Sequence, residues 1–174
     1  VSNMVPLKNP EGLIRAFAAV YKTNPHTSLL MVGDTDPAIR EYAATLSLPA
    51  GVITFTGEVP YPSVAGYMQE AGCLVLFSNI ENSPCVIGEA LCCGLPVIAT
   101  RVGGIPELID ETNGLLAEPG NEEELTAAMQ QVIARYNHYN RKAIAEAAAA
   151  KYSYPATGRL HDEVYEKARP AAGT

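Results

Sequence analysis

The sequence predicts an α/β fold, a doubly wound parallel sheet with helices on both faces. Two observations support this prediction. Short runs rich in Val, Ile, Leu and Phe alternate with longer segments of helical periodicity. The short runs are apolar along their whole length, as in strands that are buried on both faces of a parallel sheet. The fold is therefore Rossmann-like, and ligands are expected beyond the carboxyl ends of the strands.

The expected elements follow from local signals in chain order. Residues 1–5 begin extended, and Asn9-Pro10 opens a helix that Asn24-Pro25 ends. Strands are expected over 28–34, 51–57, 73–79 and 96–100, with helices over 36–48, 62–72 and 84–94 between them. A helical turn at 105–109 and a strand at 113–117 precede a helix over 121–136, which Asn121 caps. The Ala-rich tail is helical from Arg141, breaks near 153–155, and ends in a last helix at about 156–168.

Composition indicates one soluble globular domain over residues 1–174. The chain is 48% hydrophobic and 18% charged, which is enough to build a sizeable core. A net charge of -7 and a pI near 4.9 argue against nucleic-acid or anionic-membrane binding through bulk charge. No apolar run approaches the roughly 20 residues of a membrane span, and the N-terminus has no signal-peptide pattern. We therefore expect a cytoplasmic location.

The four cysteines, Cys73, Cys85, Cys92 and Cys93, lie in or beside apolar runs and lack metal-ligand spacing. We expect reduced core thiols. The alternative is a redox pair formed by the adjacent Cys92 and Cys93, which no C-x-x-C motif supports.

Three of the expected loops carry weak signals for a ligand. Lys8 beside a helix start is a candidate phosphate ligand, although taken alone a solvated lysine explains it better. Gly33 permits close backbone approach to a ligand, and it is explained equally well as a turn glycine. Glu58 and Val59, which follow Gly57, offer main-chain groups to a planar base.

The loop before the fourth helix carries the strongest signal. Asn82, Ser83 and Pro84 precede this helix, so the N–H groups around Ser83, Cys85 and Val86 are expected to suit a phosphate. Glu81 lies upstream, and Glu89 is expected two helical turns further on, a rise of about 12 Å. Such a pair would hold two parts of an extended ligand through its hydroxyls. The alternative, an acid at a helix start and an ordinary helical Glu, explains Glu89 poorly because its neighbours are apolar.

The motif E-x7-E formed by Glu81 and Glu89 is followed by EALCCGLPVIATRVGGIPELI and NGLLAEPGNEEEL in the usual order. This pattern resembles the C-terminal, donor-binding lobe of a retaining GT-B glycosyltransferase of family four, the glycosyl transferases group 1. That group includes sucrose synthase-like and bacterial polysaccharide biosynthesis enzymes. The resemblance covers nearly the whole chain.

The resemblance implies a role for each matching position. Glu81 would meet hydroxyls of the transferred sugar, Glu89 would meet the ribose, and Lys8 would stabilise the diphosphate leaving group. Backbone amides at Ser83 to Val86 would approach the sugar and the diphosphate, and the Glu58–Val59 loop would receive the base. The substrate would be a nucleoside diphosphate sugar. Neither a cofactor nor a metal is implied, since cationic side chains and the helix start supply the positive charge.

Two departures from the family pattern concern Asn3 and the Glu81–Pro84 segment. Asn3 stands where the family places a donor-site arginine, and asparagine supplies neither its charge nor its forked donors. The sequence Glu-Asn-Ser-Pro, residues 81–84, replaces the commoner Glu-Gly-Phe-Gly. Because Asn3 replaces this arginine, a nucleotide-sugar binding module without turnover is an alternative to an active enzyme. A lobe of a non-hydrolysing sugar-nucleotide epimerase is a further alternative, but the acid/base residues that it would need are not found.

The chain supplies one of the two lobes of such an enzyme. We expect an excised domain that lacks the N-terminal acceptor lobe and is inactive alone. Its last helix is expected to pack back or to cross to the missing lobe. The acceptor would be a saccharide or a lipid-linked sugar bound through that lobe, and a peripheral membrane association of the full-length enzyme stays open.

Overall fold

The structure is a computed structural model that describes residues 5–169. The extended segment expected at residues 1–5 therefore falls, apart from Val5, outside the described residues, and so does Asn3. Every helix and strand expected from residue 9 onward is present, with bounds that differ by a few residues.

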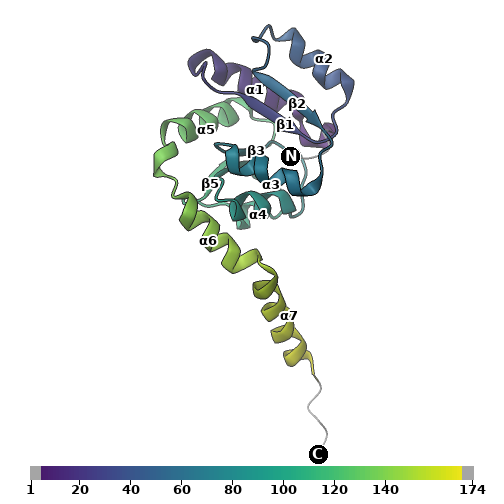
Figure 1. Cartoon of the computed structure of the whole chain (residues 1–174), viewed down its shortest axis with the longest axis vertical. Coiled ribbons are helices and arrows are strands. Elements are labelled where there is room, and N and C mark those ends of the chain that lie inside the picture. The colour runs from purple at the N-terminus through teal and green to yellow at the C-terminus, as the bar shows by residue number, and fades with distance from the viewer. Residues whose placement is uncertain (1–4, 170–174) are drawn as a thin grey trace, which may run out of the picture.

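The described chain contains seven helices and five strands, which alternate from α1 to β4 (Figure 1). Helices α1 to α7 span Pro10–Thr23, Pro37–Thr45, Tyr61–Glu70, Cys85–Cys92, Glu122–Ala134, Arg141–Tyr152 and Tyr154–Ala168. Strands β1 to β5 span Leu29–Val32, Ile53–Gly57, Leu74–Leu76, Val97–Thr100 and Gly114–Ala117. Three 3₁₀ turns, η1 to η3, span Pro6–Lys8, Ile105–Glu107 and Tyr136–His138.

All pairs of neighbouring strands are parallel, as expected for an α/β fold. Among the described residues they form two separate ladders: β1 pairs with β2, and β4 lies between β3 and β5. The α/β class with helices flanking parallel strands is thus confirmed, while β1 and β3 are not hydrogen-bonded to each other.

Helix α1 connects the two ladders. Its Phe17 and Val20 pack with α5 in one apolar cluster, which also contains Phe77 beyond β3. Its Ile14 packs with Met31 of β1 in another cluster. The opposite face of the three-stranded ladder is covered by α4 and α6, whose apolar residues are buried with those of β3 and β4. The core is therefore layered on both sides of the strands, as burial of continuous apolar runs requires.

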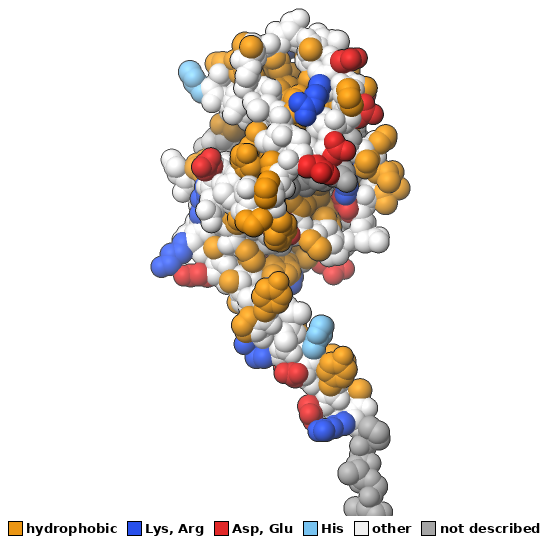
Figure 2. Space-filling view, turned by 45° about the vertical axis from the view of Figure 1, so that its right-hand side comes forward, with side chains coloured by type: hydrophobic (Ala, Val, Ile, Leu, Met, Phe, Trp, Pro, Cys, Tyr) orange, Lys and Arg blue, Asp and Glu red, His pale blue; other side chains and the backbone are white. Residues whose placement is uncertain are grey.

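The C-terminal helices form an arm. Helix α6 packs on α4 through Ile144 and Ala148, and α7 continues away from the body (Figure 1). The only buried residue described in α7 is Ala156. Figure 2 shows hydrophobic side chains on the surface of this arm. The exposed large apolar residues of α7 are Tyr154, Leu160, Val164 and Tyr165.

Candidate functional site

Lys8 and Glu81 lie in contact although 73 residues separate them. Lys8 Nζ donates to Glu81 Oε1, which also accepts a hydrogen bond from Ser78 Oγ at 2.8 Å. The backbone brings the two loops together, because the Asn79 N–H donates to the Leu7 carbonyl at 2.8 Å. The Glu81 side chain is only 10% exposed and that of Lys8 26%. The sequence predicted both residues as site residues, and the structure joins them in one ion pair.

The loop that carries Glu81 is fixed from two further directions. The Ser78 carbonyl accepts from Thr100 Oγ1 at 2.6 Å, which ties the end of β3 to the end of β4. The Gly104 N–H donates to the Asn82 carbonyl at 2.7 Å. Gly103 has a φ of +53°, and a Cβ at this position would lie 1.9 Å from the Glu81 carbonyl oxygen. Only glycine therefore allows the two loops to approach so closely.

Helix α4 begins directly after this loop, and no hydrogen bond to the Cys85 or Val86 amide is found within residues 5–169. Its N-cap is Pro84, which offers no capping side chain, and the first intrahelical hydrogen bond runs from Ile87 to Pro84 at 3.1 Å. Helix geometry leaves the N–H groups of Cys85 and Val86 without an intrahelical acceptor. Helices α1, α2, α5, α6 and α7, in contrast, are capped by a side chain. An uncapped, positive helix end that closely follows Glu81, the partner of Lys8, suits an anion.

The separation expected between the two glutamates needs a correction. The estimate of about 12 Å assumed a continuous helix from Glu81, but α4 begins only at Cys85. Glu81 belongs to the preceding loop, and Asn82 and Ser83 are exposed beside it. Glu89 lies in the second turn of α4, so it still faces a different neighbourhood from that of Glu81.

Glu89 has a partner that sequence reasoning missed. Tyr61, the first residue of α3, donates its hydroxyl proton to Glu89 Oε1 at 2.9 Å. This hydrogen bond and the negative charge of Glu89 raise the pKa of Tyr61 above its ordinary value. The Tyr61 ring is 74% exposed. A proline before and after Tyr61 marked a helix start, but no periodicity indicated contact with α4.

The loops after β1 and β2 are joined to each other. The Gly33 N–H donates to the Gly57 carbonyl at 3.0 Å, and both glycines have positive φ, +124° and +70°. The Gly33 amide is thus used within the protein, which favours its interpretation as a turn glycine. Glu58 is exposed and Val59 half-buried. In the described part of the chain, this pair of loops makes no hydrogen bond to Lys8 or Glu81.

The prediction that all four cysteines are buried core thiols is wrong in part. Cys85 and Cys92 are exposed rather than buried, because α4 presents these positions to solvent. Cys73 and Cys93 are half-buried, and all four thiols are free. Between residues 5 and 169, no group of three or more His, Cys, Asp or Glu side chains is placed to hold a metal ion. In the same range no helix has the length and apolar composition needed to cross a membrane.

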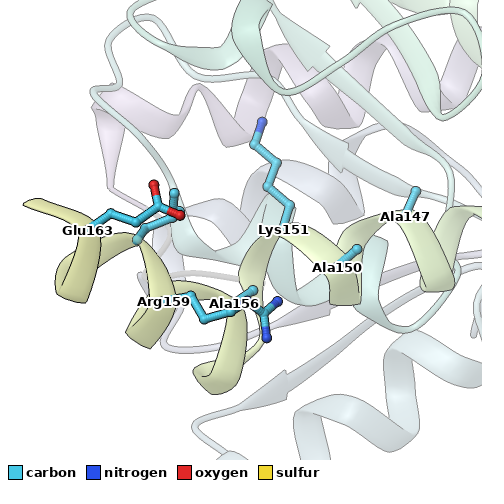
Figure 3. A pocket seen from close by; sticks show the side chains of 7 residues that line it. Ala147, Ala150, Lys151, Ala156, Arg159 and Glu163 are labelled. Atoms are coloured by element: carbon cyan, nitrogen blue, oxygen red, sulfur yellow. The ribbon is translucent and has the colours of Figure 1, made fainter.

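Two cavities lie away from Glu81 and Glu89. One is a groove of about 390 Å³ between α6 and α7, where Lys151, Arg159 and Glu163 surround small alanine side chains (Figure 3). The other is an apolar slot of about 660 Å³ between β1 and β3, which Lys8 lines at one end. Neither of these two cavities is lined by either glutamate, and the Glu81 side chain is 10% exposed.

The parallel strands and flanking helices define a Rossmann-like α/β domain, and comparison with known proteins gives the family. Residues 1–135 match the family model described as Glycosyl transferases group 1. The chain belongs to this family, whose fold is of the GT-B type.

Curated relatives are considerably longer than this chain. The D-inositol 3-phosphate glycosyltransferase of Segniliparus rotundus is 29% identical over 167 residues, which cover 90% of this chain and 36% of the relative. The N-acetyl-alpha-D-glucosaminyl L-malate synthase of Bacillus anthracis is 33% identical over 127 residues, or 70% of this chain and 32% of the relative. The chain thus spans about a third of the length of these two relatives.

Solved structures share the fold. Sucrose-phosphate synthase from Thermosynechococcus elongatus superposes with a TM-score of 0.81 at 28% identity, over 95% of this chain and 44% of that chain. Anabaena HepE in complex with UDP-glucose superposes with a TM-score of 0.82 at 23% identity, over 95% of this chain and 47% of that chain. The C-terminal domain of the group 1 protein LpcC from Francisella tularensis gives 0.77 at 19% identity, over 88% of this chain and 84% of that domain.

Proposed function

We propose that this chain is the donor-binding, C-terminal lobe of a retaining glycosyltransferase of family four. The full-length enzyme would transfer a hexose-type sugar from a nucleoside diphosphate sugar to a saccharide or lipid-linked acceptor. The observation that carries the proposal is the Lys8–Glu81 pair beside the uncapped start of α4. It combines a cation and unpaired amides for a diphosphate with a carboxylate for sugar hydroxyls.

The charge arrangement supports a diphosphate ligand. A diphosphate arriving at the α4 N-terminus would meet the Lys8 ammonium and the N–H groups of Cys85 and Val86. Lys8 would then be shared between Glu81 and the ligand, and it would neutralise charge as the sugar leaves. Ser78 would hold the Glu81 carboxylate when Lys8 moves toward the phosphates.

The second half of the site would bind the nucleoside. Glu89 would accept hydrogen bonds from the ribose hydroxyls, and Tyr61 would hold the carboxylate in position for them. The base would reach the exposed loop at Glu58 and Val59. A UDP-glucose complex of the structural neighbour HepE supports a ligand of this class for a domain of this shape.

The lobe assignment is supported by length and by α7. The chain spans less than half of sucrose-phosphate synthase and of HepE, yet it spans most of an isolated C-terminal domain. Helix α7 would dock on the N-terminal lobe, because it exposes a row of large apolar side chains beyond the body. The acceptor would bind in that lobe.

Calorimetric titration of the chain with UDP, GDP and ADP, with and without EDTA, tests the donor proposal. We expect weak binding of at least one nucleotide that EDTA does not abolish and that Lys8→Met weakens. Lys142→Met, which changes an 85% exposed lysine on α6, is the matched control. Absence of binding to all three nucleotides, or binding that strictly requires Mg²⁺, would contradict the proposal.

A binding module without turnover is the second candidate, and Asn3 is the sequence observation that favours it. Turnover by the full-length protein separates the two candidates. Sugar transfer that Glu81→Gln removes supports the enzyme, whereas nucleotide-sugar binding without any transfer supports the module.

A further inference from the structure

Arg141, the first residue of α6, contacts the C-terminal ends of two other helices. Its guanidinium donates to the Gln69 carbonyl at 3.0 Å and to the Ala71 carbonyl at 3.2 Å, where α3 ends. Its Nε donates to the Gly94 carbonyl at 3.2 Å, just beyond the end of α4. The last carbonyls of a helix carry partial negative charge and lack intrahelical donors, so a guanidinium with several N–H groups suits them.

The backbone of Arg141 is held against α4. Gly94 has a φ of +70°, and a Cβ at this position would overlap the Arg141 carbonyl oxygen. Helix α6 also packs on α4 through the buried side chains of Ile144 and Ala148. Helices α4 and α6 therefore form one packed unit, from which the Arg141 side chain reaches α3.

Helix α3 has few apolar contacts with the body. Met68 is the only buried residue of this helix, all of whose ten residues are described, and Val64 packs partly buried against the same cluster. Among the described residues, two contacts supply the hydrogen bonds that join α3 and its C-cap to other elements: Tyr61 with Glu89 at one end, and Arg141 at the other. A helix with so little burial depends on such contacts for its position.

The two ends of α3 are linked by the helix itself. Ten residues of helix are about 15 Å long and move as a unit, so a displacement at one end changes the other. At the N-terminal end Tyr61 donates to Glu89, and the loop with Glu58 and Val59 directly precedes it. The attachment of α3 at its C-terminal end therefore affects whether Tyr61 reaches Glu89.

We infer that Arg141 is a positioning residue for the nucleoside half of the proposed donor site. It holds the end of α3 on the α4–α6 unit and thereby places Tyr61 within hydrogen-bond distance of Glu89. The hydroxyl of Tyr136 accepts a further hydrogen bond from Arg141 Nη1 at 3.1 Å and helps to fix the guanidinium. The word nucleoside rests on the proposed function, whereas the placement of Tyr61 rests on these contacts alone.

The phenol of Tyr61 reports its contact with Glu89 without any nucleotide. The hydrogen bond to Glu89 and the charge of that carboxylate raise the pKa of Tyr61, with smaller effects of its other neighbours. Fluorine NMR of protein that contains 3-fluorotyrosine follows the titration, because fluorine moves the phenol pKa into a milder pH range. Tyr61→Phe assigns the resonance, and Glu89→Gln gives the pKa of Tyr61 beside a neutral partner.

Arg141→Met should lower the pKa of Tyr61 toward the value that it has in Glu89→Gln. Arg141→Lys keeps the charge but lacks the forked donors, so its effect should be intermediate, and it serves as the test if Arg141→Met does not fold. Arg15→Met is the matched control, because Arg15 is also half-buried and its guanidinium joins α1 to Glu122 and Tyr42, away from α3. This control should lower the melting temperature without changing the pKa of Tyr61.

Nucleotide affinity tests whether Arg141 acts through Tyr61. Arg141→Met should weaken binding of a nucleoside diphosphate by a few-fold, and adding Tyr61→Phe should cause no further loss, because both changes remove the same contact. Arg15→Met should bind as the unsubstituted chain does.

Two results would overturn the inference. One is an unchanged pKa of Tyr61 in both Arg141→Met and Arg141→Lys, and the other is an equal fall in Arg15→Met, which would indicate general destabilisation. If no nucleotide binds but the pKa of Tyr61 follows Arg141, the placement of Tyr61 by Arg141 is supported and only the proposed function fails. The two failures are thus distinguishable.

Discussion

Glu81 and Glu89 occupy different surroundings, and this difference predicts different effects of the same substitution. Glu81 lies in the loop and is paired with Lys8 and Ser78, whereas Glu89 lies on α4 and accepts a hydrogen bond from Tyr61 of α3. If Glu89 holds the ribose, Glu89→Gln should weaken both a nucleoside diphosphate and its nucleotide-sugar by about 1–3 kcal/mol. Glu81→Gln should weaken chiefly the nucleotide-sugar. Calorimetry with both ligands measures the two effects. Equal losses of affinity for both ligands in both variants would contradict separate roles for Glu81 and Glu89.

Tyr61→Phe tests whether the hydroxyl group positions Glu89. The substitution removes the hydrogen bond and leaves the ring, so we expect nucleotide affinity to fall by a few-fold while the melting temperature is unchanged. Tyr165→Phe is the matched control, because that ring is 72% exposed on α7 and Tyr61 is 74% exposed. If Tyr61→Phe and Tyr165→Phe bind the nucleotide equally well, Tyr61 has no positioning role.

The contacts within the candidate site differed in how far the sequence could predict them. Lys8 and Glu81 follow from the rule that loops at the carboxyl ends of parallel strands come together. Tyr61 could not be predicted in this way, because its contact with Glu89 depends on the side-chain direction at the start of α3. The exposure of Cys85 was missed since an apolar neighbourhood in sequence does not specify the face of a short helix.

At the scale of elements, the two loops that meet at Gly103 determine where Glu81 lies. Gly103→Ala would place a methyl group 1.9 Å from the Glu81 carbonyl oxygen, so the loop must move. We expect unfolding free energy to fall by about 1–3 kcal/mol and nucleotide-sugar affinity to fall with it. Chemical denaturation and calorimetry measure the two quantities.

Gly120→Ala is the matched control for backbone strain alone. Gly120 also has a positive φ, +75°, but a Cβ there would meet no atom within 4 Å. This variant should lose some stability without losing affinity. Equal affinity in the two variants would show that the approach of Gly103 to Glu81 does not position the site.

The elements themselves were predictable, and their pairing was not. Apolar runs, Pro and Asn at helix starts, and Gly at helix ends located each helix and strand to within a few residues. The division between β1 and β3 could not be predicted, because continuous apolar strands carry no register signal that names their neighbours.

At the scale of the whole molecule, α7 contributes little to the body from which it extends. One of its described residues is buried, so a chain that ends at Ser153 should melt within about 2 °C of the 174-residue chain. The same truncation of the full-length protein should lower its stability clearly, if α7 docks on a second lobe. Thermal denaturation of each protein with and without α7 measures the two effects. A large fall in the melting temperature of the 174-residue chain would show that α7 stabilises this domain itself.

The last prediction concerns activity and follows from the surroundings of Glu81 and Glu89. Sugar transfer requires an acceptor held against the donor in a site that excludes water, and neither the α6–α7 groove nor the slot between β1 and β3 is lined by the two glutamates. The 174-residue chain should therefore bind the donor without glycosylating an acceptor. Incubation with a panel of nucleotide-sugars and acceptors, followed by mass spectrometry, should show only background hydrolysis, while the full-length protein under the same conditions should form product. Clear glycosylation by the 174-residue chain would mean that this domain alone assembles the reacting site, and the requirement for a second lobe would be wrong.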